Sequence, residues 1–118
     1  MSKRILIADD NQAVRNAISN VLQKQLDVEI CATTGNGLQT VKLARALRPD
    51  IIVLDLKMPG LSGVEVAGLL KNSLPNTRVV LFTLFAETIS KSMASALGVP
   101  VISKADGLSK LVEVLRAV

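Results

Sequence analysis

The regular alternation of short apolar runs with segments of helical spacing constrains this chain more than any other feature. Five short apolar runs are each followed by a stretch in which apolar residues recur at intervals of three and four. Short apolar runs are typical of buried strands, and the wider spacing is typical of one face of a helix. Strands that alternate with helices favour a parallel sheet covered by helices on both faces. We therefore predict an α/β fold in which residues 1–118 form one domain of five strand–helix units.

The expected elements follow from this pattern. The predicted strands cover residues 4–8, 28–32, 51–54, 78–82 and 99–102, and the predicted helices have apolar faces that begin at Val14, Leu38, Val64, Ile89 and Leu108. Pro49 and Gly98 are expected to end the second and fourth helices, and Asp106 is expected to cap the fifth. Most apolar residues of the fourth helix are expected to lie in the core, namely Met93, Ala94, Ala96 and Leu97.

Composition excludes several classes of protein. A chain of 118 residues that is 49% hydrophobic, with a mean hydropathy of +0.42, can bury one core and is too apolar for a disordered tail. No apolar run approaches the roughly 18–20 residues of a membrane span. The apolar stretch after residues 1–4 is too short for a signal peptide. We therefore expect a cytoplasmic protein that makes no contact with a membrane.

Few residues of this chain are suited to metal binding or nucleophilic catalysis. The sequence has one cysteine, Cys31, and no histidine, which excludes an internal disulfide, ordinary zinc sites and any His-based triad. Cys31 lies inside a predicted strand and is expected to be a buried, unreactive thiol. Any metal must therefore be held by oxygen atoms.

Polar residues follow the predicted strands at the points where these strands end. They are Asp9 and Asp10 after the first strand, Asp55 after the third, Thr83 after the fourth and Lys104 after the fifth. Ligands of open parallel sheets bind at the carboxyl ends of the strands, so we expect these side chains to converge in one cleft. Three carboxylates in one place repel one another unless a cation is near or one of them takes up a proton. Their charge of −3 and the +1 of Lys104 leave −2, which Mg²⁺ would neutralise with hard oxygen ligands.

The same residues suit chemistry on a phosphate. Lys104 would supply a positive charge and Thr83 a hydrogen bond. Asp55 would be the nucleophile that forms an aspartyl-phosphate. Taken singly, each residue also has an ordinary structural interpretation, as a helix cap for Asp9, Asp10 or Asn11, and as a loop charge or strand end for the others.

Taken together, these residues resemble the receiver domain of two-component response regulators. The resemblance covers the whole chain and is most specific in residues 55–63, which read DLKMPGLSG. It implies a flavodoxin-like (CheY-like) doubly wound fold with strand order 2-1-3-4-5. It also implies that Asp55 accepts a phosphoryl group from a cognate histidine kinase, and that Thr83 and Lys104 contact this group. Asp10, Asp55 and the backbone carbonyl of Lys57 would bind Mg²⁺ directly, and Asp9 would act mainly through water.

The 55–63 segment, and the absence of proline after Lys104, are most similar to receivers of LuxR/NarL-type response regulators. No DNA-binding output domain lies within this chain, so we expect an excised receiver that reaches DNA only through that domain. Such a receiver is a phospho-acceptor switch rather than an enzyme that turns over a small molecule. Its fourth helix, fifth strand and fifth helix would form the output surface and the contact of a homodimer.

Two positions depart from the usual pattern of the family. Leu84 stands where a small residue is usual, and Val101 where a switch aromatic is usual. Leu84 would restrict access to Asp55, and the alternative function is therefore a pseudo-receiver that acts independently of phosphorylation. A nucleotide-binding enzyme on the same fold is disfavoured, because no glycine-rich loop follows the first strand. Lys57 and Phe85 are expected to screen a phosphoryl group on Asp55 from water.

Overall fold

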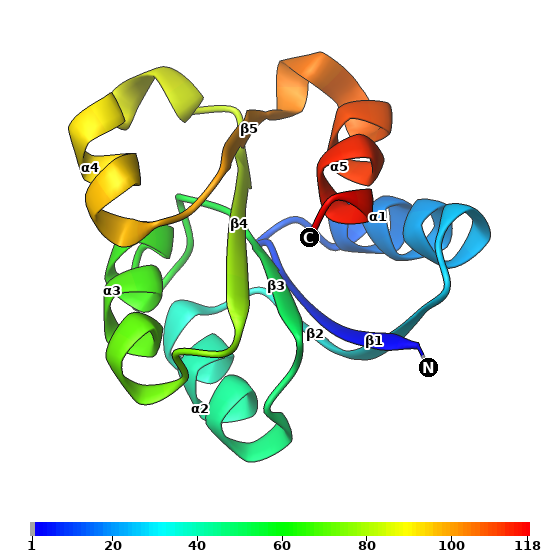
Figure 1. Ribbon diagram of the computed structural model, residues 1–118, viewed down its shortest axis with the longest axis horizontal. Coiled ribbons are helices and arrows are strands. Elements are labelled where there is room, and N and C mark those ends of the chain that lie inside the picture. The colour runs from blue at the N-terminus through cyan, green and yellow to red at the C-terminus, as the bar shows by residue number, and fades with distance from the viewer. Residues whose placement is uncertain (1) are drawn as a thin grey trace.

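In the computed structural model, which describes residues 2–118, strands and helices alternate along the chain (Figure 1). The strands are β1 (Lys3–Ala8), β2 (Val28–Thr34), β3 (Ile51–Leu54), β4 (Arg78–Thr83) and β5 (Val101–Ser103). The α-helices are α1 (Gln12–Gln25), α2 (Gly37–Leu47), α3 (Gly63–Ser73), α4 (Lys91–Leu97) and α5 (Gly107–Arg116). Two 3₁₀ turns, η1 (Ala86–Thr88) and η2 (Lys104–Asp106), precede α4 and α5. The strands pair in parallel in the order β2-β1-β3-β4-β5, so the predicted fold class and strand order are confirmed.

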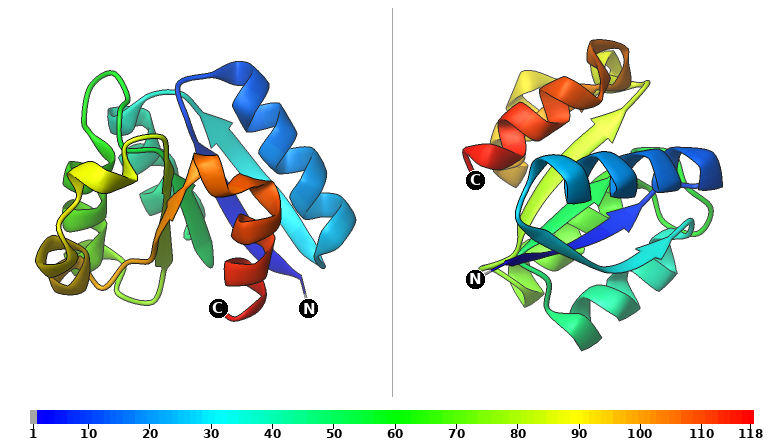
Figure 2. Two further views of the ribbon diagram at one scale, coloured as in Figure 1. Left: turned by 90° about the horizontal axis from the view of Figure 1, so that it is seen from above. Right: turned by 90° about the vertical axis from the view of Figure 1, so that its right-hand side faces the viewer.

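The helices cover both faces of the sheet. α1 and α5 lie on one face, and α2, α3 and α4 lie on the other (Figures 1 and 2). Because side chains alternate between the two faces of a strand, Ile5 and Ile7 of β1 pack with α1 and α5, whereas Leu6 and Ala8 pack with α2 and α3. Both faces of the central strands are therefore apolar, as in other sheets covered on both sides. Over the residues described, none of the helices is long and apolar enough to span a membrane.

Cys31 lies on the edge strand β2, where the register against β1 shifts by one residue. Its thiol donates a hydrogen bond to the carbonyl of Ile5 at 3.4 Å and is half-buried rather than fully buried. Burial raises the pKa of this thiol, which keeps it protonated near neutral pH. The prediction of an unreactive thiol is consistent with this environment.

The ends of the helices agree with the sequence at some positions and differ at others. Gly98 follows α4 with a φ of 67°, the left-handed conformation that glycine adopts most easily, so its predicted role as a cap is confirmed. Arg48 ends α2 just before Pro49, as expected. The prediction for Asp106 is wrong, because its side chain makes no capping hydrogen bond to α5. Asp106 has helical backbone angles inside η2, whereas a capping residue needs an extended backbone.

The prediction that α4 contributes mostly core residues is also wrong. No residue of α4 is buried, and Met93 is 43% exposed. The helix has seven residues and begins only at Lys91, after Ser90 accepts a hydrogen bond from the backbone N–H of Met93. It lies beside β5, an edge strand of three residues that offers little sheet surface to cover (Figure 1).

Candidate functional site

The parallel sheet brings the predicted polar residues to one edge. Ala8 and Leu54, the last residues of β1 and β3, are paired, so the next residues, Asp9 and Asp55, lie side by side. The backbone N–H of Asp55 donates to the carbonyl of Ala8 at 2.9 Å, which extends this pairing past the end of the strand. Thr83 is the last residue of β4 and pairs with Ser103, directly before Lys104.

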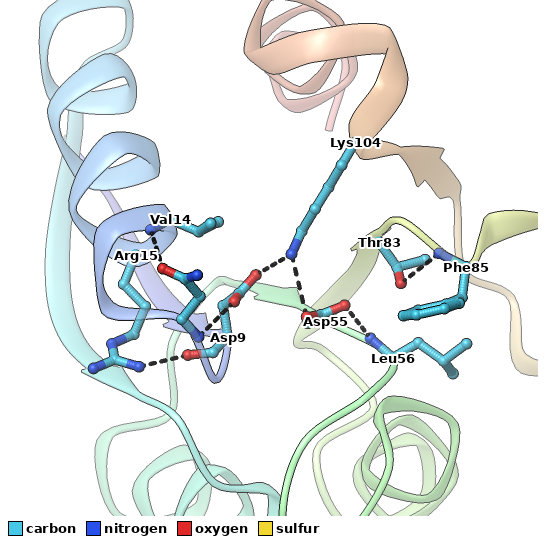
Figure 3. Close-up of polar contacts among 9 residues, drawn as sticks. Asp9, Val14, Arg15, Asp55, Leu56, Thr83, Phe85 and Lys104 are labelled. Carbon is cyan, nitrogen blue, oxygen red and sulfur yellow. Dashed lines mark hydrogen bonds and ion pairs between the residues drawn. The ribbon is translucent and has the colours of Figure 1, made fainter.

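The ammonium group of Lys104 joins the two buried carboxylates. Its Nζ lies 2.6 Å from Oδ2 of Asp9 and 3.2 Å from Oδ2 of Asp55 (Figure 3). Asp9 and Asp55 are 1% and 6% exposed, so both interactions are largely shielded from water. Hydrogen bonds between charged groups are stronger in such surroundings than on an open surface.

The remaining oxygen atoms of the site accept hydrogen bonds from the backbone. Oδ1 of Asp9 accepts from the N–H of Asn11 at 2.9 Å, and Oδ1 of Asp55 accepts from the N–H of Leu56 at 2.7 Å. The hydroxyl oxygen of Thr83, which is fully buried, accepts from the N–H of Phe85 at 3.1 Å (Figure 3). Each carboxylate therefore offers one oxygen to the backbone and the other to Lys104.

A tight turn holds the acidic loop after β3 in place. The N–H of Gly63, at the start of α3, donates to the carbonyl of Leu56 at 2.7 Å. A Cβ atom at position 63 would lie 2.2 Å from the carbonyl oxygen of Asp55, so only glycine fits this contact. This contact fixes the backbone of the loop that carries Asp55.

The electrostatics of the site oppose ionisation of Asp55. Burial raises the pKa of this carboxyl, the negative charge of Asp9 raises it further, and the charge of Lys104 only partly compensates. For Lys104, burial lowers the pKa, but the hydrogen bond from Lys104 to Asp9 and the charges of Asp55 and Asp9 outweigh it and raise the pKa overall. Lys104 is therefore charged at neutral pH, whereas ionisation of Asp55 is costly.

The carboxylates are arranged to hold a cation. Asp9, Asp10 and Asp55 each offer an oxygen atom, and these atoms all lie within 4.8 Å of one another. Oxygen atoms that share one octahedral Mg²⁺ lie roughly 3–4 Å apart, so a small contraction of the cluster suffices. Asp10 is exposed and borders a hollow of about 550 Å³ that is also lined by Leu56, Lys57, Met58, Pro59 and Ser62. The hard oxygen donors and the excess negative charge fit Mg²⁺.

The sequence left three candidates for the cap of α1, and the structure selects Asn11. Its side-chain oxygen accepts from the N–H of Val14 at 3.1 Å. Asp9 and Asp10 are thereby available for the site. Sequence reasoning missed Arg15, which donates from its guanidinium to the carbonyl of Asp9 at 2.6 Å (Figure 3). It also missed that the ammonium of Lys57 lies over the ring of Phe85, 4.1 Å from its centroid.

Comparisons with known proteins identify the family. The family model of the response regulator receiver domain matches residues 5–116. The response regulator VraR of Staphylococcus saprophyticus is 33% identical over 117 residues, which cover 98% of this chain and 56% of the relative. The transcriptional regulatory protein LnrK of Bacillus subtilis is 35% identical over 85 residues, which cover 72% of this chain and 39% of the relative. The chain therefore spans about half or less of the length of these relatives.

Solved structures support the same assignment. A LuxR-family DNA-binding response regulator from Staphylococcus aureus has a TM-score of 0.89 at 28% identity and covers 98% of this chain and 97% of its own. The response regulator domain of CheB from Thermotoga maritima has a TM-score of 0.88 at 26% identity, with coverages of 99% and 96%. This chain belongs to the receiver domains of two-component response regulators, and its relatives include response regulators of the LuxR family.

The raised pKa of Asp55 predicts how Asp55→Asn changes stability in metal-free buffer. Stability associated with a raised carboxyl pKa is present below the ordinary value of 3.8 and is lost as the pH rises through the folded-state pKa. The uncharged variant does not undergo this loss. We therefore expect its midpoint of thermal unfolding to exceed that of the wild type at pH 7, and this difference to shrink toward pH 3.5.

Calorimetry across this pH range with a chelator present measures the difference. Asp106→Asn is the matched control, because Asp106 is exposed and its side chain caps nothing. An Asp55→Asn variant that is no more stable than the wild type at pH 7 would contradict the electrostatic account.

Proposed function

We propose that this chain is a phosphorylation switch in which Asp55 accepts a phosphoryl group from a phosphohistidine of a cognate histidine kinase, in a Mg²⁺-dependent reaction. The single observation that carries the proposal is the pair of buried carboxylates, Asp9 and Asp55, held by the ammonium of Lys104. Membership of the receiver family supports it. Two acids and a lysine at the ends of three strands have little value for folding, but they match the needs of phosphoryl transfer.

The transfer is a substitution at phosphorus. An oxygen of the Asp55 carboxylate forms a bond to phosphorus while the phosphorus–nitrogen bond of the phosphohistidine breaks. The electron pair of that bond stays on the imidazole nitrogen, and the product on this chain is an acyl phosphate. Only the phosphoryl group moves, so the protein's contribution is mainly positioning and charge stabilisation.

Each neighbouring residue has a role in this proposal. Lys104, already within 3.2 Å of Asp55, donates to a phosphoryl oxygen. The oxygen of the Thr83 hydroxyl accepts a hydrogen bond from the N–H of Phe85, and the hydroxyl proton would be donated to the phosphoryl group at Asp55. Asp10, Asp55 and the carbonyl of Lys57 are the ligands that we assign to Mg²⁺, with Asp9 acting through water. When bound, the ion neutralises negative charge on the carboxylates and the phosphoryl group.

The proposed switch acts on a DNA-binding output domain and on a second copy of the chain. We assign the chain to a cytoplasmic transcription regulator of the LuxR/NarL type, in which DNA is contacted only through an output domain. The LuxR-family relatives support this assignment. The surface formed by α4, β5 and α5 is the proposed switching and homodimer face, and the absence of buried residues in α4 supports its freedom to shift.

The alternative, a pseudo-receiver that works without phosphorylation, rests on Leu84 and Val101. Leu84 is 66% exposed, which argues against a side chain wedged over the Asp55 carboxylate. Val101 is half-buried and packs with the core on the side of α2 and α3, so it is a small apolar residue in place of a switch aromatic. The exposure of Leu84 favours a working acceptor.

Mass spectrometry after incubation with acetyl phosphate, with and without Mg²⁺, tests the proposal. The wild type is expected to gain one phosphoryl group only when Mg²⁺ is present, and Asp55→Asn is expected to gain none. Uptake that is equal in the Asp55→Asn variant would refute Asp55 as the acceptor. If the wild type gains nothing, Leu84→Ala separates the causes, because restored uptake indicates a blocked site and continued silence indicates a pseudo-receiver.

The contact of Lys57 with Phe85 predicts the lifetime of the phosphoryl group. The two residues lie in the loops that follow β3 and β4, each two positions after a residue of the site, Asp55 or Thr83. A cation–π contact at an exposed site is worth about 0.5–1 kcal/mol, so its loss is expected to speed hydrolysis by about two- to fivefold. Lys57→Met and Phe85→Ala should both do so, and the double variant should be no faster than the faster single one.

The measurement is the decay of the phosphorylated species after the phosphoryl donor is removed. Leu69→Ala, an exposed leucine on α3, is the control and should decay at the rate of the wild type. Additive effects of the two single substitutions would show that the residues act separately.

A further inference from the structure

Asp9 is held by four hydrogen bonds that come from different parts of the chain. Its carboxylate accepts from Asn11 and Lys104, and its backbone N–H donates to the carbonyl of Thr34 at 2.9 Å. The fourth bond comes from Arg15, one turn into α1, whose guanidinium donates to the carbonyl oxygen of Asp9 at 2.6 Å (Figure 3). Each polar group of Asp9, in the backbone and in the side chain, therefore has a partner.

The bond from Arg15 has a consequence for the next residue. A peptide unit is planar, so a fixed carbonyl of Asp9 also fixes the direction in which the chain enters Asp10. Asp10 is exposed, and no hydrogen bond from its side chain is present among the described residues. Its carboxylate is thus directed at the cluster with Asp9 and Asp55 mainly by the backbone. Arg15 also brings a positive charge beside an acidic pair.

Gly35, in the loop between β2 and α2, provides the space that Arg15 occupies. A Cβ atom at this position would lie 2.8 Å from a guanidinium nitrogen of Arg15, and at ordinary contact distance, 3.4 Å, from Cα of Asp10 and the carbonyl oxygen of Asp9. The φ angle of Gly35 is not in the left-handed region, so alanine is compatible with the backbone there. The close contact of an added methyl group is therefore with the end of the Arg15 side chain.

We propose that Arg15 is a positioning residue for cation binding, and that glycine at position 35 leaves the space its side chain needs. The guanidinium holds the Asp9 carbonyl and thereby sets the Asp10 carboxylate toward the cation. The inference rests on the proposed function, since it deepens the account of the same site. It concerns the placement of the ligands and not the transfer of the phosphoryl group. Residues that orient metal ligands typically contribute about 10- to 100-fold to affinity.

The test is a calorimetric titration of Mg²⁺ alone into the wild type, Arg15→Ala, Arg15→Lys, Gly35→Ala and the double variant Arg15→Ala/Gly35→Ala. Arg15→Ala is expected to raise the Kd for Mg²⁺ about 10-fold, and Arg15→Lys, which keeps a hydrogen-bond donor for the Asp9 carbonyl, to recover part of this loss. Gly35→Ala is expected to raise the Kd in the wild-type background. In the Arg15→Ala background it should change the Kd by less than about twofold, because the contact is gone.

Arg45→Ala is the matched control, because Arg45 is an exposed arginine in the last turn of α2. Thermal unfolding without Mg²⁺ separates positioning from folding, since a merely structural role lowers the unfolding midpoint without changing the Kd of the folded protein. With acetyl phosphate, the Arg15→Ala variant should need more Mg²⁺ for half-maximal uptake and reach the wild-type rate at saturation.

The outcomes distinguish this inference from the proposed function. An unchanged Kd in Arg15→Ala, equal effects of Gly35→Ala in both backgrounds, or no binding of Mg²⁺ to the wild type would each overturn the role of Arg15. If the wild type binds Mg²⁺ but neither it nor its Leu84→Ala variant takes up a phosphoryl group, the proposed function is refuted, while the titrations still decide whether Arg15 positions the cation ligands.

Discussion

One lysine ammonium between two buried carboxylates is the interaction on which the rest of this site depends. Lys104 joins the ends of β1, β3 and β5, because Asp9 and Asp55 follow the first two of these strands. Loss of Lys104 would leave two buried carboxylates without a counter-charge, and leaving a buried charge unpaired in this way typically costs about 3–5 kcal/mol. Here the single positive charge of Lys104 faces the two carboxylates of Asp9 and Asp55, so this group of three side chains keeps a net negative charge when both carboxylates are ionised. Asp10 adds a further negative charge at its rim.

The fold supplies this arrangement through the geometry of parallel strands. Pairing of Ala8 with Leu54 sets two carboxylates side by side, and the tight contact at Gly63 fixes the loop behind Asp55. This arrangement disfavours the charged form of Asp55, because burial and the neighbouring Asp9 raise the pKa of its carboxyl. Perturbed acids in a cleft are a frequent mark of functional sites, where charge is arranged for a ligand rather than for stability. An arrangement made for a ligand rather than for stability also explains why the carboxylates of Asp9, Asp10 and Asp55 lie together at this edge of the sheet.

The sequence was sufficient to predict the alternation of strands and helices, because buried strands and amphipathic helices leave strong patterns. The order of the strands came only from the resemblance to receivers. The prediction that α4 contributes mostly core residues was wrong. Helical spacing in the sequence does not reveal how little of the sheet a helix at its edge can cover. Asp9, Asp10 and Asn11 are all good helix caps by type, and only backbone geometry selects Asn11. The contact of Arg15 with the loop at Gly35 depends on the spacing of α1 and the β2–α2 loop, which no local pattern encodes.

The central claim is that one of three clustered aspartates carries the phosphoryl group, and the most direct measurement is to find which one. After incubation with acetyl phosphate and Mg²⁺, borohydride reduces an acyl phosphate to an alcohol that persists through digestion and peptide sequencing by mass spectrometry. The account predicts modification at Asp55 alone. Asp9 and Asp55 both contact Lys104, but only Asp55 follows β3, the strand paired with β4, at whose end Thr83 lies. Modification at Asp9 or Asp10 instead, or at none of the three in a protein that binds Mg²⁺, would contradict it.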